Sequence, residues 1–187
     1  MDGLLTIEPL QESHVEVIQN FKCEDEPDVE EFLREDAMMY QLRNMAKTRL
    51  FFDGNHNLIG YFSVFNDHVC IGRTKRKKAN ITPPKGINHF PAIRLHYLGV
   101  DSRYRKKGYG EEILLSVLEH CYKLALITGC TLITVQALKS SMGFYQNYDF
   151  IIWKQEARKY TDMFFKIQNL EGLLHTDDER EFLNNFV

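Results

Sequence analysis

The fold of this chain is decided by the sequence Leu95-His96-Tyr97-Leu98-Gly99-Val100-Asp101-Ser102-Arg103-Tyr104-Arg105-Lys106-Lys107-Gly108-Tyr109-Gly110. Its first part predicts a strand over residues 93–100. A helix over 110–128 follows, since apolar side chains recur there at helical spacing and Gly129 is suited to end it. Another strand is predicted over 131–137. Two strands joined by one helix form a βαβ unit, so we expect these strands to run parallel with a right-handed crossover.

The flanking sequence adds elements on both sides of this unit. Gly54-Asn55-His56-Asn57 separates two strand-like runs and predicts a β-hairpin. Residues 72–89 are polar, basic and proline-containing, which indicates a long loop. The other predicted elements are a strand at 3–8, helices at 13–20 and 27–46, hairpin strands at 48–53 and 58–65, a short helix at 140–147, strands at 150–154 and 163–167, and a terminal helix at 170–187. Together they predict an α/β fold, one domain over residues 1–187 with a mixed central sheet of about six or seven strands and flanking helices.

Composition places the chain among ordinary globular proteins. It has 187 residues, of which 44% are hydrophobic, enough to bury a core. No apolar run approaches the ~20 residues of a membrane span, and the N-terminus lacks the pattern of a signal peptide. The four cysteines form no Cys-x-x-Cys pair, and the seven histidines show no zinc-ligand spacing. We therefore expect a cytoplasmic protein with free thiols, no membrane partner and no metal.

The charges are unevenly distributed along the chain. Residues 1–39 carry 12 acidic and 2 basic side chains, whereas residues 40–110 carry 14 basic and 3 acidic ones. The net charge of the whole chain is only −3. An anionic ligand is therefore expected to bind the middle third of the sequence.

The turn between the central strand and its helix has the composition of a pyrophosphate site. Gly108 and Gly110 allow close approach of the backbone to a ligand, and the helix that follows adds unpaired N–H groups and the positive end of its dipole. The Rossmann fingerprint requires a third glycine where Ile113 stands, and the P-loop requires Gly-Lys-Ser/Thr, which is missing. A basic surface turn before an ordinary helix is the alternative interpretation.

This segment resembles the GNAT acetyltransferases. Leu98-Gly99-Val100-Asp101 is similar to that family's L-A-V-D, and residues 105–110 satisfy its R/Q-x-x-G-x-G/A loop. The resemblance implies a GNAT-like fold with a splayed βαβ unit, acetyl-CoA as co-substrate and transfer of acetyl to an amine. It also implies that the central strand pairs with the pantetheine arm and that the amides of 106–111 hold the pyrophosphate. The implied cofactor-binding residues are Leu98, Gly99, Val100, Arg105, Lys106, Lys107, Gly108, Tyr109, Gly110 and Glu111.

Two catalytic candidates accompany this resemblance. Phe144-Tyr145 and the following Asp149-Phe150 resemble the family's F-Y-x-x-x-G-F, with Asp149 in place of glycine. The resemblance implies that Tyr145 lies beside the sulfur of coenzyme A, where a protonated phenol is suited to act as general acid. His96 is a candidate general base because it shares a strand face with Leu98. For both residues, packing in the core is the alternative interpretation.

Looser patterns are similar to the TacT-like toxin sub-group, whose members acetylate the α-amine of aminoacyl-tRNA. They include Phe21-Lys22-Cys23 and Leu58-Ile59-Gly60-Tyr61. Five basic residues within 73–78 fit RNA phosphates, although a solvated loop has the same composition. The acceptor therefore stays open between a small amine, a protein and aminoacyl-tRNA, and a non-catalytic module that binds coenzyme A or nucleic acid is a further alternative. A homodimer also stays open.

Overall fold

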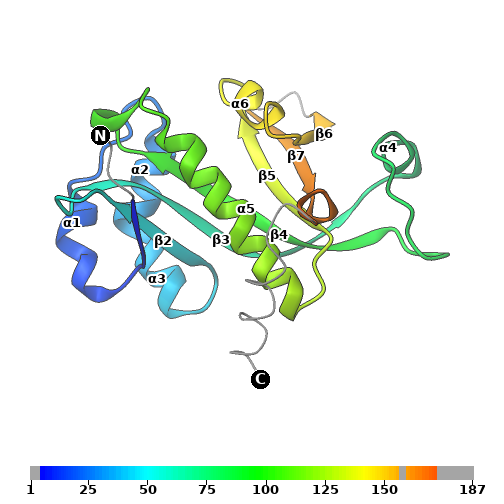
Figure 1. Cartoon of the computed structure of the whole chain (residues 1–187), viewed down its shortest axis with the longest axis horizontal. Coiled ribbons are helices and arrows are strands. Elements are labelled where there is room, and N and C mark those ends of the chain that lie inside the picture. Colours follow the sequence, from blue (N-terminus) through cyan, green and yellow to red (C-terminus); the bar gives the residue numbers. More distant parts are fainter. Residues whose placement is uncertain (1–4, 156–158, 172–187) are drawn as a thin grey trace. The chain divides into compact units, whose positions relative to one another are not determined.

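The central feature of the fold is a mixed sheet. In the computed structural model, which describes residues 5–155 and 159–171, seven strands pair in the order β1-β2-β3-β4-β5-β7-β6 (Figure 1). The strands are β1 (Thr6–Pro9), β2 (Lys47–Phe52), β3 (Leu58–Cys70), β4 (His89–Val100), β5 (Leu132–Leu138), β6 (Ile151–Gln155) and β7 (Tyr160–Lys166). The α and π helical elements are α1 (Val15–Gln19), α2 (Pro27–Glu31), η2 (Phe32–Asp36), α3 (Ala37–Leu42), α4 (Arg73–Lys78), α5 (Tyr109–Ile127) and α6 (Met142–Gln146). Short 3-10 turns are η1 (Glu12–His14), η3 (Ser102–Tyr104) and η4 (Ile167–Leu170).

The predicted βαβ unit is confirmed. Strands β4 and β5 are neighbours in the sheet, α5 connects them, and they form its parallel pair. The β1–β2, β2–β3, β5–β7 and β6–β7 pairs are antiparallel. The α/β class and the mixed sheet of six or seven strands are thus as the sequence predicts.

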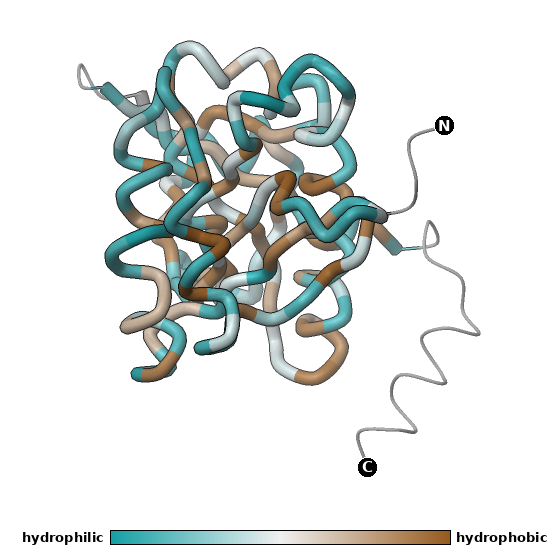
Figure 2. The backbone as a smooth tube through the Cα atoms, turned by 90° about the vertical axis from the view of Figure 1, so that its left-hand side faces the viewer, coloured by the Kyte–Doolittle hydropathy of each residue, from teal (hydrophilic) through white to brown (hydrophobic). Residues whose placement is uncertain are grey.

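The chain forms two compact units. The first combines Met1–Phe65 with Leu95–Val117, and the second combines Asn66–Arg94 with Leu118–Val187. A hydrophobic cluster in the first unit includes Phe21, Leu33 and Tyr61, while one in the second includes Ile71, Leu132 and Phe164. Figure 2 shows hydrophobic and hydrophilic stretches interspersed along the backbone.

The connection between β3 and β4 differs from the predicted loop. Within residues 72–89 the chain forms helix α4, and β3 runs on to Cys70 (Figure 1). Buried Ile71 and Ala79 stand on either side of α4. The basic side chains of its last turn complement the negative end of the helix dipole. This electrostatic preference favours a helix, although the polar composition of the segment indicates a loop.

The long helix predicted over 27–46 is also only partly correct. It is divided by the π-helical segment η2 and ends at Leu42, after which Asn44 adopts a positive φ of 55°. The short helix predicted at 13–20 begins with 3-10 turn η1. The predicted terminal helix lies mostly outside the described residues, which include only η4 and Glu171 from that end of the chain. None of the helices in the described part of the chain is long and apolar enough to cross a bilayer.

Candidate active site

The turn after β4 is anchored by a buried carboxylate. Asp101 has no exposed surface, and its Oδ2 accepts hydrogen bonds from the backbone N–H of Lys22 at 3.0 Å and from Arg103 Nη2 at 2.8 Å. Its Oδ1 accepts from the Arg103 backbone N–H and from Nε. Burial alone raises the pKa of such a carboxyl, but these hydrogen bonds hold the pKa of Asp101 below its usual range. The Asp of the L-A-V-D resemblance therefore fixes where the turn begins.

Arg105 joins the turn to the segment before α2. Its guanidinium donates to the Val100 carbonyl oxygen at 3.3 Å, to Cys23 Sγ at 3.0 Å and to the Asp25 carboxylate. Burial raises the pKa of the Cys23 thiol to about 11, although the neighbouring Arg105 opposes this shift. The Arg105 side chain thus braces the turn. Sequence reasoning missed both of its partners, because Cys23 and Asp25 are about eighty residues away along the chain.

The glycine-containing part of the turn is exposed and has unusual backbone angles. Lys106 has φ 60° and Gly108 has φ +88°, and no atom lies within 4 Å of a Cβ built on Gly108. Helix α5 begins at Tyr109, and the Gly108 carbonyl oxygen accepts from the backbone N–H groups of Glu111 and Glu112. Both glutamates are exposed. Open space at the N-terminus of a 19-residue helix beside two exposed lysines suits an anionic group such as a pyrophosphate.

The end of β4 packs too closely for a side chain at Gly99. A Cβ built there lies 2.6 Å from Val29 Cγ1 and 2.9 Å from Tyr61 Cε1. Gly60 is equally confined, since its Cβ would lie 2.4 Å from the Gly99 carbonyl oxygen. This explains why the chain has glycine where the family pattern has alanine. On either side of Gly99, Leu98 and Val100 are half-buried.

His96 lies among aromatic rings. Its ring centroid is 5.0 Å from that of Phe32, 5.1 Å from that of Phe65 and 6.0 Å from that of Tyr40. Tyr97 stacks on the same Phe32 ring at 4.4 Å. Both neighbouring side chains, His96 and Tyr97, therefore contact the Phe32 ring.

Tyr145 belongs to the second unit, where α6 presents it. Its side chain is buried between the rings of Phe144 and Phe150, whose centroids lie 5.2 and 5.3 Å away. Burial raises the pKa of the Tyr145 hydroxyl above its usual range, so this phenol keeps its proton at neutral pH. Asp149 has φ 61°, the left-handed conformation that the family's glycine adopts easily. Aspartate thus takes the backbone conformation for which the family pattern has glycine.

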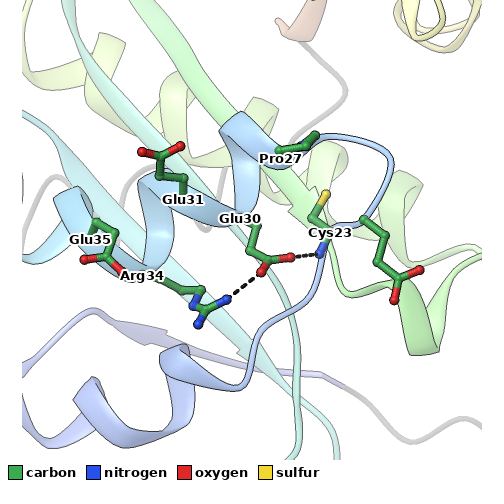
Figure 3. A pocket seen from close by; sticks show the side chains of 7 residues that line it. Cys23, Pro27, Glu30, Glu31, Arg34 and Glu35 are labelled. Carbon is green, nitrogen blue, oxygen red and sulfur yellow. Dashed lines mark hydrogen bonds and ion pairs between the residues drawn. The ribbon is translucent and has the colours of Figure 1, made fainter.

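An acidic pocket lies in the first unit against α2 and η2. It has a volume of about 510 Å³, and its lining includes Glu24, Glu30, Glu31 and Glu35 (Figure 3). Glu30 accepts from the Cys23 backbone N–H at 2.8 Å and from Arg34 at 2.5 Å, and the first of these bonds does most to lower its pKa. Figure 3 shows this pair of bonds, with the Glu31 and Glu35 side chains on the same helical segment. Sequence reasoning identified the acidic charge of this region but not the pocket.

The predicted site residues are thus distributed over both units. The first unit brings together His96, the strand end 98–100 and the turn 105–111, whereas Tyr145 lies in the second. Within the part of the chain that the structure describes, no group of three or more His, Cys, Asp or Glu side chains is arranged to hold a metal ion.

Comparison with known proteins identifies the family. Residues 15–150 match the model of the acetyltransferase (GNAT) family. The match covers well over half of the chain, and the chain therefore belongs to this family. It is accordingly an N-acetyltransferase that uses acetyl-CoA. No curated protein matches the sequence.

Solved structures share the fold at low sequence identity. A point mutant of KacT is 21% identical with a TM-score of 0.77, over 91% of this chain and 99% of that one. A structure described as a bacterial toxin is 18% identical with a TM-score of 0.77, over 92% and 98%. AtaT in complex with acetyl-methionyl-tRNAfMet is 20% identical with a TM-score of 0.75, over 91% and 99%. These likenesses establish the shared fold.

Proposed function

We propose that residues 1–187 act as one catalytic domain in which the turn after β4 binds the pyrophosphate of acetyl-CoA. The observation that carries this proposal is the exposed turn at Gly108, which has open space above it and leads into the N-terminus of α5. Backbone N–H groups of residues 106–110 and the charges of Lys106 and Lys107 bind the anion there, while the Glu111 N–H donates to the Gly108 carbonyl oxygen. The end of β4, residues 98–100, offers backbone groups to the pantetheine arm.

Chemistry at this site requires two proton transfers. Acetyl-CoA supplies an acetyl group activated as a thioester. We propose that Tyr145 donates its phenolic proton to the departing sulfur, since its buried hydroxyl stays protonated at neutral pH. His96 takes the proton that the amine loses as its nitrogen forms the new C–N bond. A packing role for His96 predicts instead that His96→Phe preserves turnover better than His96→Gln, whereas a base predicts loss in both.

Binding of acetyl-CoA is tested by thermal unfolding. Ligand at 100 times its Kd stabilises a protein by about 2.7 kcal/mol, which corresponds to a rise in Tm of roughly 5–11 °C for a chain of this size. Gly108→Glu places a carboxylate where the phosphates bind, so we expect this shift to disappear. Gly86→Glu is the matched control, because Gly86 also has a positive φ, 85°, and open surroundings, but lies in the β3–β4 connection. A shift that survives in Gly108→Glu, or disappears equally in Gly86→Glu, contradicts the proposal.

Specific observations support two classes of acceptor amine. The carboxylates of Glu24, Glu31 and Glu35 give the acidic pocket a charge that attracts a protonated amine, as on a small cation or a basic peptide. The α-amine of aminoacyl-tRNA is the second candidate, and it rests on two observations. One is the likeness to AtaT, and the other is the exposed basic surface of α4.

RNA binding separates these candidates. Neutralising Lys75, Lys77 and Lys78 to Gln removes up to three phosphate contacts, which lowers the salt-dependence slope of the affinity for aminoacyl-tRNA by about 2–3. Lys47→Gln together with Lys123→Gln is the control outside α4. Unchanged affinity and slope after the α4 substitutions count against RNA as the acceptor.

A homodimer and a cytoplasmic location stay predictions. The mass in solution tests the first, and cell fractionation tests the second.

A further inference from the structure

The turn that the proposed function assigns to acetyl-CoA is held against residues 20–25, the segment that precedes α2. The Lys22 backbone N–H donates to Asp101 Oδ2 at 3.0 Å, and the Lys22 carbonyl oxygen accepts from the Ser102 backbone N–H at 2.8 Å. The Glu24 backbone N–H donates to Ser102 Oγ at 3.2 Å. Because these bonds use backbone groups of the segment, they fix where its next side chains stand relative to the turn.

Arg105 contacts two of these side chains. Each of its three side-chain nitrogens has a partner within the protein. Nε donates to the Val100 carbonyl oxygen at 3.3 Å, at the end of β4, and Nη2 donates to Cys23 Sγ at 3.0 Å. Nη1 donates to the Asp25 carboxylate. Cys23 is buried, whereas the Asp25 side chain is 63% exposed. The guanidinium is therefore engaged in contacts that hold the turn, although its charge would also suit a phosphate ligand.

Asp25 brings a negative charge to an anion-binding loop. It pairs with Arg105, the first residue of the R-x-x-G-x-G motif. A carboxylate at this place repels an anionic ligand, so electrostatics alone predicts that its removal tightens the binding of acetyl-CoA. An ion pair that keeps the turn in its binding conformation acts in the opposite direction.

We propose that Asp25 is a positioning residue for acetyl-CoA, which holds Arg105 as a brace of the turn, and that Arg105 is not itself a phosphate ligand. Cys23 completes the brace from the buried side. With the brace in place, Lys106 and Gly108 keep the positive φ angles of the open turn. This inference rests on the proposed function of the turn.

The two possible roles of Arg105 differ in the sign of one measurement. If Arg105 is a brace, removal of the Asp25 carboxylate loosens the turn, and acetyl-CoA binds less tightly. If Arg105 is a phosphate ligand, the same change releases the guanidinium, and acetyl-CoA binds more tightly.

Isothermal titration calorimetry of the full chain with acetyl-CoA measures this sign. We expect Asp25→Asn to raise Kd about 2–5-fold, the range that an exposed ion pair contributes. Asp25→Glu keeps the charge and is expected to restore most of the affinity. Asp28→Asn is the matched control, because Asp28 is also exposed and carries the same charge three residues later, in the first turn of α2. Its substitution is expected to leave Kd unchanged or to lower it.

Arg105→Gln makes the test specific. It removes the guanidinium and its contacts, so we expect a larger rise in Kd, and Asp25→Asn adds nothing further in that background. A Kd that falls or stays the same in Asp25→Asn, an equal rise in Asp28→Asn, or additive effects of Asp25→Asn and Arg105→Gln overturn the proposal. A weaker affinity accompanied by a lower Tm of the ligand-free protein also overturns it, because the change then acts on the stability of the fold.

Gly108→Glu separates this inference from the proposed function. Loss of binding in Gly108→Glu together with native affinity in Asp25→Asn overturns the positioning role alone. Native affinity in Gly108→Glu overturns the proposed function of the turn and this inference with it.

Discussion

Replacement of Gly99 by alanine is expected to destabilise the first unit by overpacking it. The added Cβ lies 2.6 Å from Val29 Cγ1, 2.9 Å from Tyr61 Cε1 and 3.2 Å from Phe21 Cζ. The Tyr61 ring cannot easily withdraw, because it is fully buried and its hydroxyl donates to the Val29 carbonyl oxygen at 2.6 Å. Gly99 does not have a positive φ, so the cost is steric alone. Overpacking of a filled core costs about 1–3 kcal/mol.

Urea unfolding measures this cost as a lower midpoint at unchanged slope. For a chain of this size, a loss of 1–3 kcal/mol also lowers Tm by roughly 2–12 °C. Gly143→Ala is the matched control, because Gly143 lies in α6 with no atom within 4 Å of its built Cβ, and alanine there is neutral or stabilising.

A double variant identifies the colliding atom. Val29→Ala alone costs about 1.6 kcal/mol for two lost methyl groups. Because it removes Val29 Cγ1, we expect Gly99→Ala to cost at least about 0.5 kcal/mol less in that background than in the native one. Full stability of the single Gly99→Ala variant, or strict additivity of the two changes, would refute the packing argument.

Two further predictions concern the site. Asp101→Asn removes the charge that accepts from Lys22 and Arg103, and we expect the free energy of unfolding at pH 7 to fall by about 1.5–3 kcal/mol. The pKa of Asp101 is lower in the folded state than in the unfolded state, so its contribution to the free energy of unfolding is complete above the unfolded pKa of ~3.9. This contribution is lost as pH falls through the folded pKa. The difference in unfolding free energy between the native protein and the variant therefore closes in acid. Unfolding curves from pH 7 to 3 measure this gap, and a constant difference would contradict the assignment. Tyr145→Phe is expected to lower kcat about 100-fold or more while the Tm shift with acetyl-CoA persists, whereas Tyr148→Phe preserves kcat. Near-native turnover of Tyr145→Phe would remove this residue from the proposed acid role.

Sequence reasoning predicted the elements whose signal is local. The βαβ unit follows from apolar periodicity on either side of the glycine-containing turn. It was wrong about α4 and about the length of the helix that begins at Pro27. In both cases contacts of buried residues such as Ile71 and Leu33 outweigh a composition that indicates a loop or one continuous helix.

The sequence by itself determined the family pattern, the positions of the turn and its glycines, and the tyrosine of α6, because each is encoded within a few neighbouring residues. Only the tertiary structure decided how the turn is held. The bonds of Asp101 to Lys22 and of Arg105 to Cys23 and Asp25 join positions about eighty residues apart. It also determined that Gly99 admits no side chain and that four glutamates line one pocket. Such contacts depend on which surfaces the packed elements bring together, and no local spacing in the sequence records that.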